Sequence, residues 1–316
     1  MAARLLDGQT VAAAIRQSVL PEVHAFSARA GRPPGLGIVL VGENPASQIY
    51  VRNKVRAGTE AGLWVDLQRL PETATIEELL ALVERLNASD RHDGILVQSP
   101  LPDVMGKAAA QRVFDAINPA KDVDGFHPVN VGRLVQGRAH LAPCTPSGII
   151  EMLDQGGIRI GGALAVVIGR SEIVGKPMAM LLLQRDATVT ICHSKTPNLA
   201  SQAARADILV AALGRPAFVT PEFVKPGATV IDVGINRVTD RRALERVLGA
   251  DSPRLADFDR RGSLVIGDVH PAVTDRAGAL TPVPGGVGPL TVAMLLKNTV
   301  AAAHFRLHIQ LRSAGR

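Results

Sequence analysis

Aromatic side chains are scarce in this sequence of 316 residues: they make up 3% of it, with one tryptophan and one tyrosine. Proteins that bind single-stranded nucleic acid stack the bases on aromatic rings, so the scarcity disfavours that function. The net charge of +6 and the pI near 9.8 would allow a polyanionic partner. An anionic small molecule explains the same basicity equally well.

Cysteines and long apolar runs are also few. Cys144 and Cys192 are the only cysteines, and they lack metal-ligand spacing and form no disulfide framework, which fits a reducing cytoplasm. No run of about 18 apolar residues occurs, so we expect no membrane span, and the first residues lack the apolar core of a signal peptide. The sequence also contains no Walker motif, no G-x-S-x-G and no convincing Ser-His-Asp pattern.

What the sequence does contain is a series of short runs rich in Val, Ile and Leu, separated by helical patterns. Continuous apolar runs are typical of parallel strands that are covered on both faces. Their alternation with helices indicates an α/β fold. The strands that we expect are residues 36–42, 94–99, 164–169, 188–192, 207–214 and 229–234.

Prolines indicate how the chain divides into domains. Two of them precede an apolar helical stretch within residues 141–150, and Pro289 suits the first position of a long last helix. We expect two domains with a cleft between them. The first is an α/β catalytic domain of residues 1–143, onto which the C-terminal helix 288–316 packs back. The second, residues 144–287, is a Rossmann-type dinucleotide-binding domain with a mainly parallel sheet.

The second domain contains a turn that is typical of cofactor binding. Residues 169–175, G-R-S-E-I-V-G, follow an expected strand and precede an amphipathic helix. The turn departs from the dinucleotide fingerprint G-x-G-x-x-G, because Ser171 replaces the middle glycine and the last glycine falls one residue late. We expect the amides at the N-terminus of this helix to bind a phosphate.

The next strand indicates which cofactor is bound. It ends in I-C-H-S-K-T and lacks the carboxylate that normally accepts the ribose 2′-hydroxyl of NAD. His193, Ser194 and Lys195 offer donors and a cation instead, and Arg170 in the first turn offers a second cation. Such groups suit a 2′-phosphate, so the sequence favours NADP. A doubly wound domain that binds another ligand stays open.

Two polar side chains of the first domain follow or adjoin its expected strands. Gln98 ends an apolar run, where it either caps a loop or binds a polar heterocycle. In the helix that contains Y-V-R-N-K, Tyr50 and Lys54 lie within about 40° of each other, whereas Arg52 and Arg56 fall on the opposite face. A lysine on that face of small residues is either desolvated, which lowers its pKa and fits it for proton transfer, or it snorkels to water. The geometry leaves both interpretations open.

The segment K-D-V-D-G-F-H-P is expected to form a loop. Its carboxylates can bind the N–H and amino groups of a ring, or set the backbone of a turn. A metal site of Asp122, Asp124 and His127 is a further but weaker interpretation. His304 and His308, at helical spacing, lack a third ligand and are expected on a solvated helix face.

Nine segments in this order closely resemble the bifunctional methylenetetrahydrofolate dehydrogenase/methenyltetrahydrofolate cyclohydrolase family, over about residues 4–300. They are YVRNK, DGILVQSPLP, KDVDGFHP, PCTPSG, VIGRSEIVGKP, CHSKT, DVGIN, GDV and TPVPGGVGPLT. The resemblance implies a homodimer that oxidises 5,10-methylenetetrahydrofolate with NADP and then hydrolyses the 5,10-methenyl cation to 10-formyltetrahydrofolate, both in one cleft. It implies an oxidoreductase and hydrolase of one-carbon metabolism that serves purine, methionine and histidine biosynthesis, with no metal.

The resemblance also implies roles for individual residues. Lys54 is the principal catalytic residue of the hydrolysis, Gln98 assists it, Tyr50 lies against the folate rings, and Asp122 holds the pterin. The implied catalytic residues are Lys54, Tyr50, Gln98 and Asp122; the implied substrate contacts are Tyr50, Lys54, Val97, Gln98, Ser99, Asp122, Pro282, Pro284, Gly285 and Gly286; and the implied cofactor contacts are Gly169, Arg170, Ser171, Ser194, Lys195, Thr196 and Ile235.

The sequence departs from the family pattern at two places. Leu290 stands where the family commonly has methionine, and His270 and Pro271 stand where an aromatic residue usually follows GDV. One alternative is an NADP-dependent dehydrogenase of similar two-domain architecture that acts on another small substrate. A second alternative is a basic nucleic-acid-binding protein with a degenerate nucleotide fold, which strong salt-dependent nucleic-acid binding without NADP binding would favour.

Overall fold

The computed structural model describes residues 2–314, and they form two compact units. One unit comprises Met1–Val11 and Thr145–Leu290, and we call it the six-stranded unit. The other comprises Ala12–Cys144 and Thr291–Arg316, and we call it the three-stranded unit. The first eleven residues differ from the expected division, because Arg4 and Leu5 pair with Ala279 and Leu280 in the larger sheet.

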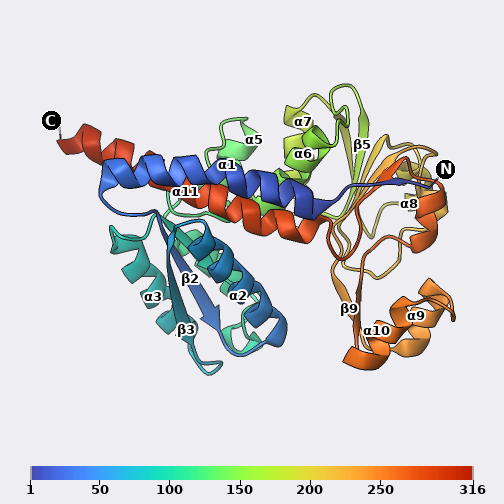
Figure 1. The fold of residues 1–316 in the computed structure, drawn as a ribbon, viewed down its shortest axis with the longest axis horizontal. Helices are drawn as coiled ribbons and strands as arrows, with labels where there is room; N and C mark the ends of the chain where they lie inside the picture. Colours follow the sequence, from blue (N-terminus) through green and yellow to red (C-terminus); the bar gives the residue numbers. More distant parts are fainter. Residues whose placement is uncertain (1, 315–316) are drawn as a thin grey trace. The chain divides into compact units, whose positions relative to one another are not determined.

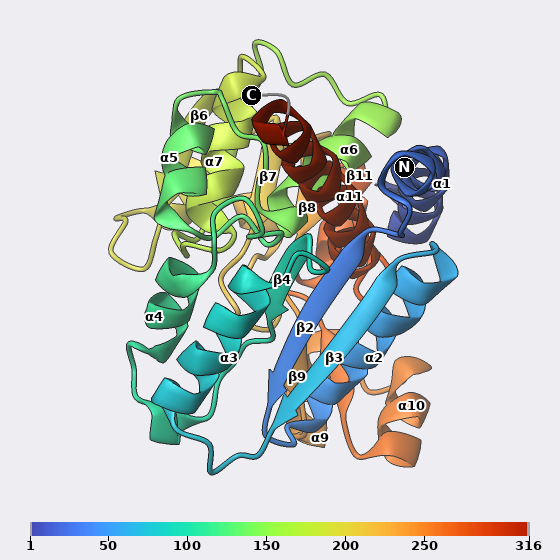
Figure 2. The same ribbon diagram turned by 90° about the vertical axis from the view of Figure 1, so that its left-hand side faces the viewer.

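The three-stranded unit is built on a parallel sheet in the order β3-β2-β4 (Figure 2). The central strand reads G-L-G-I-V-L-V and is buried along its whole length, as its continuous apolar run predicts. The long last helix begins at Val287, two residues before Pro289. The elements are β2 (Gly35–Val41), β3 (Trp64–Leu70), β4 (Gly94–Val97), α2 (Pro45–Glu60), α3 (Ile76–Ala88), η1 (Asp103–Met105), α4 (Ala109–Ala116) and α5 (Pro128–Val135), with most of α1 (Gly8–Ala30) and of α11 (Val287–Ala314).

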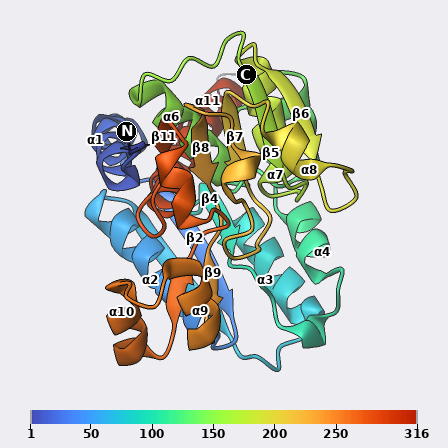
Figure 3. The ribbon, with the colours of Figure 1, turned by 90° about the vertical axis from the view of Figure 1, so that its right-hand side faces the viewer.

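The six-stranded unit contains a sheet in the order β1-β11-β8-β7-β5-β6 whose neighbours all pair in parallel (Figure 3). Its edge strand β6 is mostly exposed, whereas β7 and β8 are buried throughout. The elements are β1 (Arg4–Leu5), α6 (Cys144–Gln155), β5 (Leu164–Ile168), α7 (Gly175–Gln184), β6 (Thr188–Cys192), α8 (Leu199–Ala203), β7 (Ile208–Ala211), η2 (Pro221–Phe223), β8 (Thr229–Asp232), η3 (Pro271–Asp275) and β11 (Ala279–Leu280).

A small helical subdomain follows β8 and was not expected from the sequence. Strands β9 (Asn236–Val238) and β10 (Leu264–Ile266) form an antiparallel pair, and between them lie α9 (Arg241–Leu248) and α10 (Arg254–Arg261). Figure 1 shows the two helices side by side beyond β9. Buried Leu244 and Leu255 join Ala217 and Ile266 in a cluster of their own, which stabilises the subdomain.

Both sheets have a point where the chain changes direction across the sheet. From β2 the chain passes to β3 on one side, and it then returns to β4 on the other side of β2. From β5 it passes to β6, and it then returns to β7 on the other side of β5. Ligands of open α/β sheets bind beyond the carboxyl ends of strands at such points. We therefore expect ligand-binding residues in the segments that follow β2, β4, β5, β6 and β7.

None of the described helices is long and apolar enough to cross a bilayer.

Candidate functional site

Lys54 is buried on α2, with 7% of its surface exposed, while Arg52 and Arg56 on the opposite face are exposed. Its Nζ donates a hydrogen bond to Oε1 of Gln98 at 2.9 Å. Gln98 is the first residue after β4, so the ammonium lies at the carboxyl end of that strand. A snorkelling lysine would extend its ammonium into water, and this one is held inside by an amide oxygen.

The amide of Gln98 is oriented by its own surroundings. Its Nε2 donates to the carbonyl of Ser99 at 2.6 Å, and this leaves Oε1 as the acceptor for Lys54. The backbone amide of Gln98 donates to the carbonyl of Val39 at 2.9 Å, which extends the pairing of β2 and β4 by one residue. Val97 is buried in the strand, and Ser99 is exposed. Gln98 therefore links α2 to the sheet in one defined orientation.

Asp122 was expected to hold a ring, but its carboxylate is engaged by the loop itself. One oxygen accepts from the amide of Gly125 at 3.1 Å, and the other accepts from the amide of His127 and from Nδ2 of Asn130, both at 2.8 Å. The residue is 2% exposed, and burial raises the pKa of this carboxyl. With three donors on its two oxygens, Asp122 fits a loop-forming role and does not fit that of a ring-binding group.

Asp124 is the functional candidate that the sequence reasoning passed over. It is half-buried, and within residues 2–314 its carboxylate accepts no hydrogen bond. Burial raises the pKa of Asp124 to about 6, the charge of Lys54 lowers it, and the charge of Asp122 raises it. A signal for this assignment was present in D-V-D-G, because Asp at the first and Gly at the fourth position of a turn marks Asp122 as the turn former. Gly125 indeed has φ of +73°.

Lys121 anchors the start of the same loop. Its ammonium donates to the carbonyls of Leu86, Asn87 and Ser89 at 3.0, 2.6 and 2.7 Å, and the side chain is 2% exposed. These carbonyls lie at the end of α3, where carbonyls run out of intrahelical donors and only Leu86 accepts from the amide of Ser89, so a cation there is favourable. Burial, together with the nearby charge of Arg306, lowers the pKa of Lys121 to about 8. The loop therefore starts from a fixed point.

Tyr50 lies one turn before Lys54 on α2 and is half-buried. Burial raises the pKa of its hydroxyl. Among the described residues its ring has no aromatic or cationic partner, and its hydroxyl has no hydrogen bond. The ring is thus free to contact a ligand, as the resemblance implies.

The metal interpretation finds no support within residues 2–314, where no three acidic, histidine or cysteine side chains gather into a potential metal site. The expectation of a solvated helix face holds for His308, which is exposed, and only in part for His304. Its ring packs edge-on against Phe26 of α1 at 5.5 Å, and Nε2 lies 3.1 Å from the carbonyl of Glu22. His304 is therefore part of a helix–helix contact, with 26% of its side chain exposed.

The cofactor turn of the six-stranded unit begins at Gly169. Ile168 pairs with Cys192, so the segments that follow β5 and β6 leave the sheet side by side. Gly169 has φ of +132°, and a Cβ there would lie 2.1 Å from the carbonyl oxygen of Ala212 after β7. Only glycine fits this close approach, which keeps the turn flat against the end of the sheet.

Ser171 uses the amides that were expected to bind a phosphate. Its Oγ accepts from the backbone amides of Val174 and Gly175, both at 3.2 Å. These donors at the start of α7 are therefore engaged by Ser171 in this structure, and phosphate binding by this turn stays a prediction. Side chains that can also bind an anion lie in the turns after β5 and β6, and they are Arg170, Ser194 and Lys195.

Arg170 and Lys195 are exposed in those two turns, and neither forms an ion pair within the described part of the chain. Thr196 shapes the second turn, because its Oγ1 accepts from the amide of His193 at 2.9 Å and its own amide donates to the His193 carbonyl. Ser194 is exposed beside them. The two cations and the hydroxyl provide the charge and donors that a 2′-phosphate requires.

The same edge of the sheet continues to the expected folate side. Ile235, 52% exposed, follows β8, and residues 282–286 follow β11. Gly285 accepts from the amide of Gly8 at 3.0 Å and has φ of +104°, and a Cβ on Gly8 would lie 1.6 Å from the Gly286 carbonyl oxygen. Four strand spacings separate β6 from β11, or about 19 Å. The predicted cofactor residues and the glycine-rich segment thus lie along one sheet edge.

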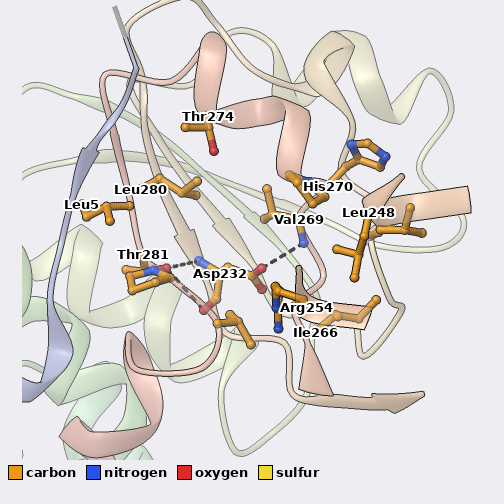
Figure 4. Close-up of a pocket in the computed structure, with 16 residues that line it drawn as sticks. Leu5, Asp232, Leu248, Arg254, Ile266, Val269, His270, Thr274, Leu280 and Thr281 are labelled. Atoms are coloured by element: carbon orange, nitrogen blue, oxygen red, sulfur yellow. Dashed lines mark hydrogen bonds between the residues drawn. The ribbon is translucent and has the colours of Figure 1, made fainter. Parts of the chain in front are cut away.

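A pocket of about 220 Å³ opens beside this edge (Figure 4). Asp232 lies in it and is 4% exposed; its carboxylate accepts from the amides of Asp268 and Val269 at 2.9 and 3.0 Å. Burial raises the pKa of Asp232 to about 7. His270 lines the pocket and caps η3 by accepting from the amide of Ala272, so this departure from the family pattern has a local structural role. Leu290, the other departure, is fully buried.

Comparison with known proteins covers nearly the whole chain. Residues 6–124 match the catalytic domain of the tetrahydrofolate dehydrogenase/cyclohydrolase family, and residues 143–307 match its NAD(P)-binding domain. The bifunctional protein FolD of Solibacter usitatus is 56% identical over 304 residues, which cover 96% of this chain and 98% of that protein.

Two solved structures are similar over the same extent. The bifunctional enzyme FolD, a methylenetetrahydrofolate dehydrogenase/cyclohydrolase, from Campylobacter jejuni has a TM-score of 0.85 and 41% identity, and the match covers 96% of this chain and 100% of that one. The FolD of Trypanosoma brucei, complexed with NADP cofactor and inhibitor, has a TM-score of 0.85 and 39% identity, with 97% and 99% covered. The chain therefore belongs to the tetrahydrofolate dehydrogenase/cyclohydrolase family.

Proposed function

We propose that this protein oxidises 5,10-methylenetetrahydrofolate with NADP and then hydrolyses the resulting 5,10-methenyl cation to 10-formyltetrahydrofolate. The observation that carries the proposal is the buried ammonium of Lys54, held by Oε1 of Gln98 at 2.9 Å beside the charge of Asp124. A buried lysine with one amide acceptor and one nearby carboxylate fits a proton-transfer group better than a surface cation.

The hydrolysis needs proton transfer at two points. Water adds to the methenyl carbon and loses a proton, and a C–N bond then breaks as its nitrogen gains a proton. As a neutral amine Lys54 can accept the first proton, and as the resulting ammonium it can supply the second, while Gln98 fixes its direction. We assign to Asp124 the place in this site that the resemblance gave to Asp122, because its carboxylate accepts no hydrogen bond from residues 2–314 and interacts with Lys54. Tyr50, one helical turn away, packs its ring against the folate.

The oxidation needs positioning more than acid–base chemistry. The nitrogens next to the methylene carbon drive the loss of hydride, which NADP accepts. The six-stranded unit would contribute Gly169, Arg170 and Ser171 with Ser194, Lys195 and Thr196 for the phosphates, and Ile235 for the rest of the cofactor. The glycine-rich segment with Pro282, Pro284, Gly285 and Gly286 would line the folate. That both steps act on one folate in one cleft stays a prediction.

Two assays test the proposal. Purified protein mixed with methylenetetrahydrofolate and NADP should reduce the NADP. Protein given methenyltetrahydrofolate alone should consume it faster than buffer does, which the loss of methenyl absorbance measures. An NADP-dependent dehydrogenase for another substrate, the alternative function, would fail both assays while still binding NADP.

We further propose a homodimer, a cytoplasmic location, and a role in the one-carbon supply to purine, methionine and histidine biosynthesis. The edge strand β6 supports the dimer, because it is mostly exposed and carries the exposed apolar side chain of Ile191. Both cysteines are buried and free, which fits a reducing compartment. Light scattering of the purified protein would measure its mass, and a monomer at working concentration would contradict the dimer.

A further inference from the structure

Asn298 on α11 is a buried asparagine whose amide joins two separate loops of the three-stranded unit. Its Nδ2 donates to the carbonyl of Val123 at 2.8 Å and to the carbonyl of Ala142 at 2.9 Å. The residue is 7% exposed, and its Nδ2 also lies 3.5 Å from Sγ of Cys144. Asn298 is not among the residues that the resemblance or the proposed chemistry assigns to the site.

The first of these bonds acts directly on Asp124. The carbonyl of Val123 and the amide of Asp124 belong to one peptide unit, which is planar. A donor that fixes the carbonyl therefore fixes the plane from which the Asp124 side chain departs. Val123 is fully buried, so its carbonyl oxygen cannot bond to solvent water. It accepts a hydrogen bond from Asn298 instead.

The second bond fixes the loop against its neighbour. Residues 142–143 pack on Gly125 so closely that a Cβ on this glycine would lie 2.6 Å from the carbonyl carbon of Ala142. The Sγ of Cys144 also contacts the Val123 carbonyl, at 3.3 Å. Asn298 thus closes a junction at which two backbone segments touch without intervening side chains.

The hydrogen bonds of Lys121 and of Asp122 fix other parts of the same loop. Lys121 holds the start of the loop at the end of α3, and the Asp122 carboxylate folds the turn that follows. Neither group bonds to the peptide between Val123 and Asp124. Within residues 2–314, the side chains that donate to the carbonyl of this peptide are Asn298, through an N–H group, and Cys144, through the weaker S–H donor.

We propose that Asn298 is a positioning residue for the hydrolysis step, which orients Asp124 toward Lys54 through the Val123 carbonyl. The proposal rests on the function proposed above. It predicts that loss of the two donors impairs hydrolysis of the methenyl cation more than oxidation of the methylene compound, because the oxidation depends less on proton transfer.

Asn298→Leu tests this, because leucine has a similar size and no donor. We expect kcat for hydrolysis to fall by about tenfold or more, with a change of less than about threefold in kcat for NADP reduction. The pH at which hydrolysis reaches half its maximum should also move, since the environment of Asp124 changes. Asn298→Ser keeps one donor and should lie between the wild type and the leucine variant; it carries the test if Asn298→Leu does not fold.

Asn87→Leu is the matched control. The Asn87 side chain also joins two backbone groups of the same unit, the carbonyl of Ala116 and the amide of Asn118, at 2.7 and 2.8 Å. It touches neither Val123 nor Asp124, so this variant should leave the ratio of the two activities unchanged even where its melting temperature falls.

An unchanged ratio in both Asn298 variants, or an equal change in Asn87→Leu, would overturn the positioning role. The wild-type protein distinguishes these outcomes from a failure of the proposed function. If the wild-type protein itself does not hydrolyse methenyltetrahydrofolate, the function is wrong. If it does and the Asn298 variants keep its ratio of activities, only the role of Asn298 is wrong.

Discussion

The ammonium of Lys54 and the amide oxygen of Gln98 lie 2.9 Å apart, and the two residues are 44 positions apart in the chain. The contact joins helix α2 to the carboxyl end of β4. It forms because the Nε2 of Gln98 donates to the next carbonyl, which turns Oε1 toward the lysine. Predictions about the hydrolysis follow from this pair and from the acid near it.

The two aspartates of the 121–127 loop should differ in their effect on hydrolysis. Asp124→Asn removes the carboxylate beside Lys54, and we expect kcat for hydrolysis to fall by about 10²-fold or more. Asp122→Asn keeps one acceptor oxygen but weakens a turn that holds three hydrogen bonds. We expect this variant to lower the melting temperature and to reduce both activities in parallel. Equal specific loss of hydrolysis in both variants would contradict the assignment to Asp124.

Hydrolysis should depend on pH through the same carboxyl. Because burial raises the pKa of Asp124 to about 6, the group is protonated below that pH and ionised above it. If the ionised form acts with Lys54, the rate rises as the pH increases through about 6 and then levels off. A pH profile of methenyl hydrolysis, corrected for the uncatalysed rate, measures this limb. A rate of hydrolysis that stays constant across the range of about one pH unit on either side of this pKa would show that Asp124 does not titrate in the step.

The choice of NADP should depend on Arg170 and Lys195. Replacing either cation by alanine removes a charged donor, and we expect KM for NADP to rise about tenfold to a hundredfold. KM for NAD should stay nearly the same, because NAD has no 2′-phosphate. Lys176→Ala is the control, since Lys176 pairs with Glu172 at 3.3 Å within α7 and its turn. Equal rises in KM for both cofactors would contradict the phosphate assignment.

Lys121 should contribute to stability rather than to chemistry. Lys121→Met removes three hydrogen bonds to carbonyls at the end of α3, and we expect the free energy of unfolding to fall by about 2–4 kcal/mol. Lys107→Met, at an exposed position, should change it by less than about 0.5 kcal/mol. Urea unfolding of both variants measures the difference. A Lys121 variant as stable as the Lys107 variant would show that the three hydrogen bonds contribute nothing net.

Much of the fold was accessible from the sequence because buried parallel strands are continuous apolar runs. All six expected strands occur, with ends that shift by at most a few residues. Strand β3 was missed because Asp66 and Arg69 interrupt its apolar pattern, and β1 and β11 were missed because two residues carry no period. Residues 1–11 were placed in the wrong unit for the same reason. The helices α9 and α10 are rich in arginine and have only narrow apolar faces, so their sequences showed no clear helical pattern of apolar residues.

The candidate site could be predicted from the sequence only in part. The helical angle placed Lys54 on a face apart from Arg52 and Arg56, and the burial of these three residues agrees with it. No periodicity distinguishes Asp122 from Asp124, because residues two apart point the same way in an extended chain. The turn at Gly125 separates them, and that turn depends on hydrogen bonds formed only in the folded loop. Asn298 carries no sequence signal, since its partners lie more than 150 residues away.

The central claim is that Lys54 is needed for hydrolysis and much less for oxidation. Its most direct test follows one reaction of Lys54→Met with methylenetetrahydrofolate and NADP, with Arg52→Met, on the opposite face of α2, as the matched control. The account predicts that Lys54→Met still reduces NADP and that methenyltetrahydrofolate accumulates, whereas the control consumes it as the wild type does. Normal consumption of methenyltetrahydrofolate by Lys54→Met would contradict the account.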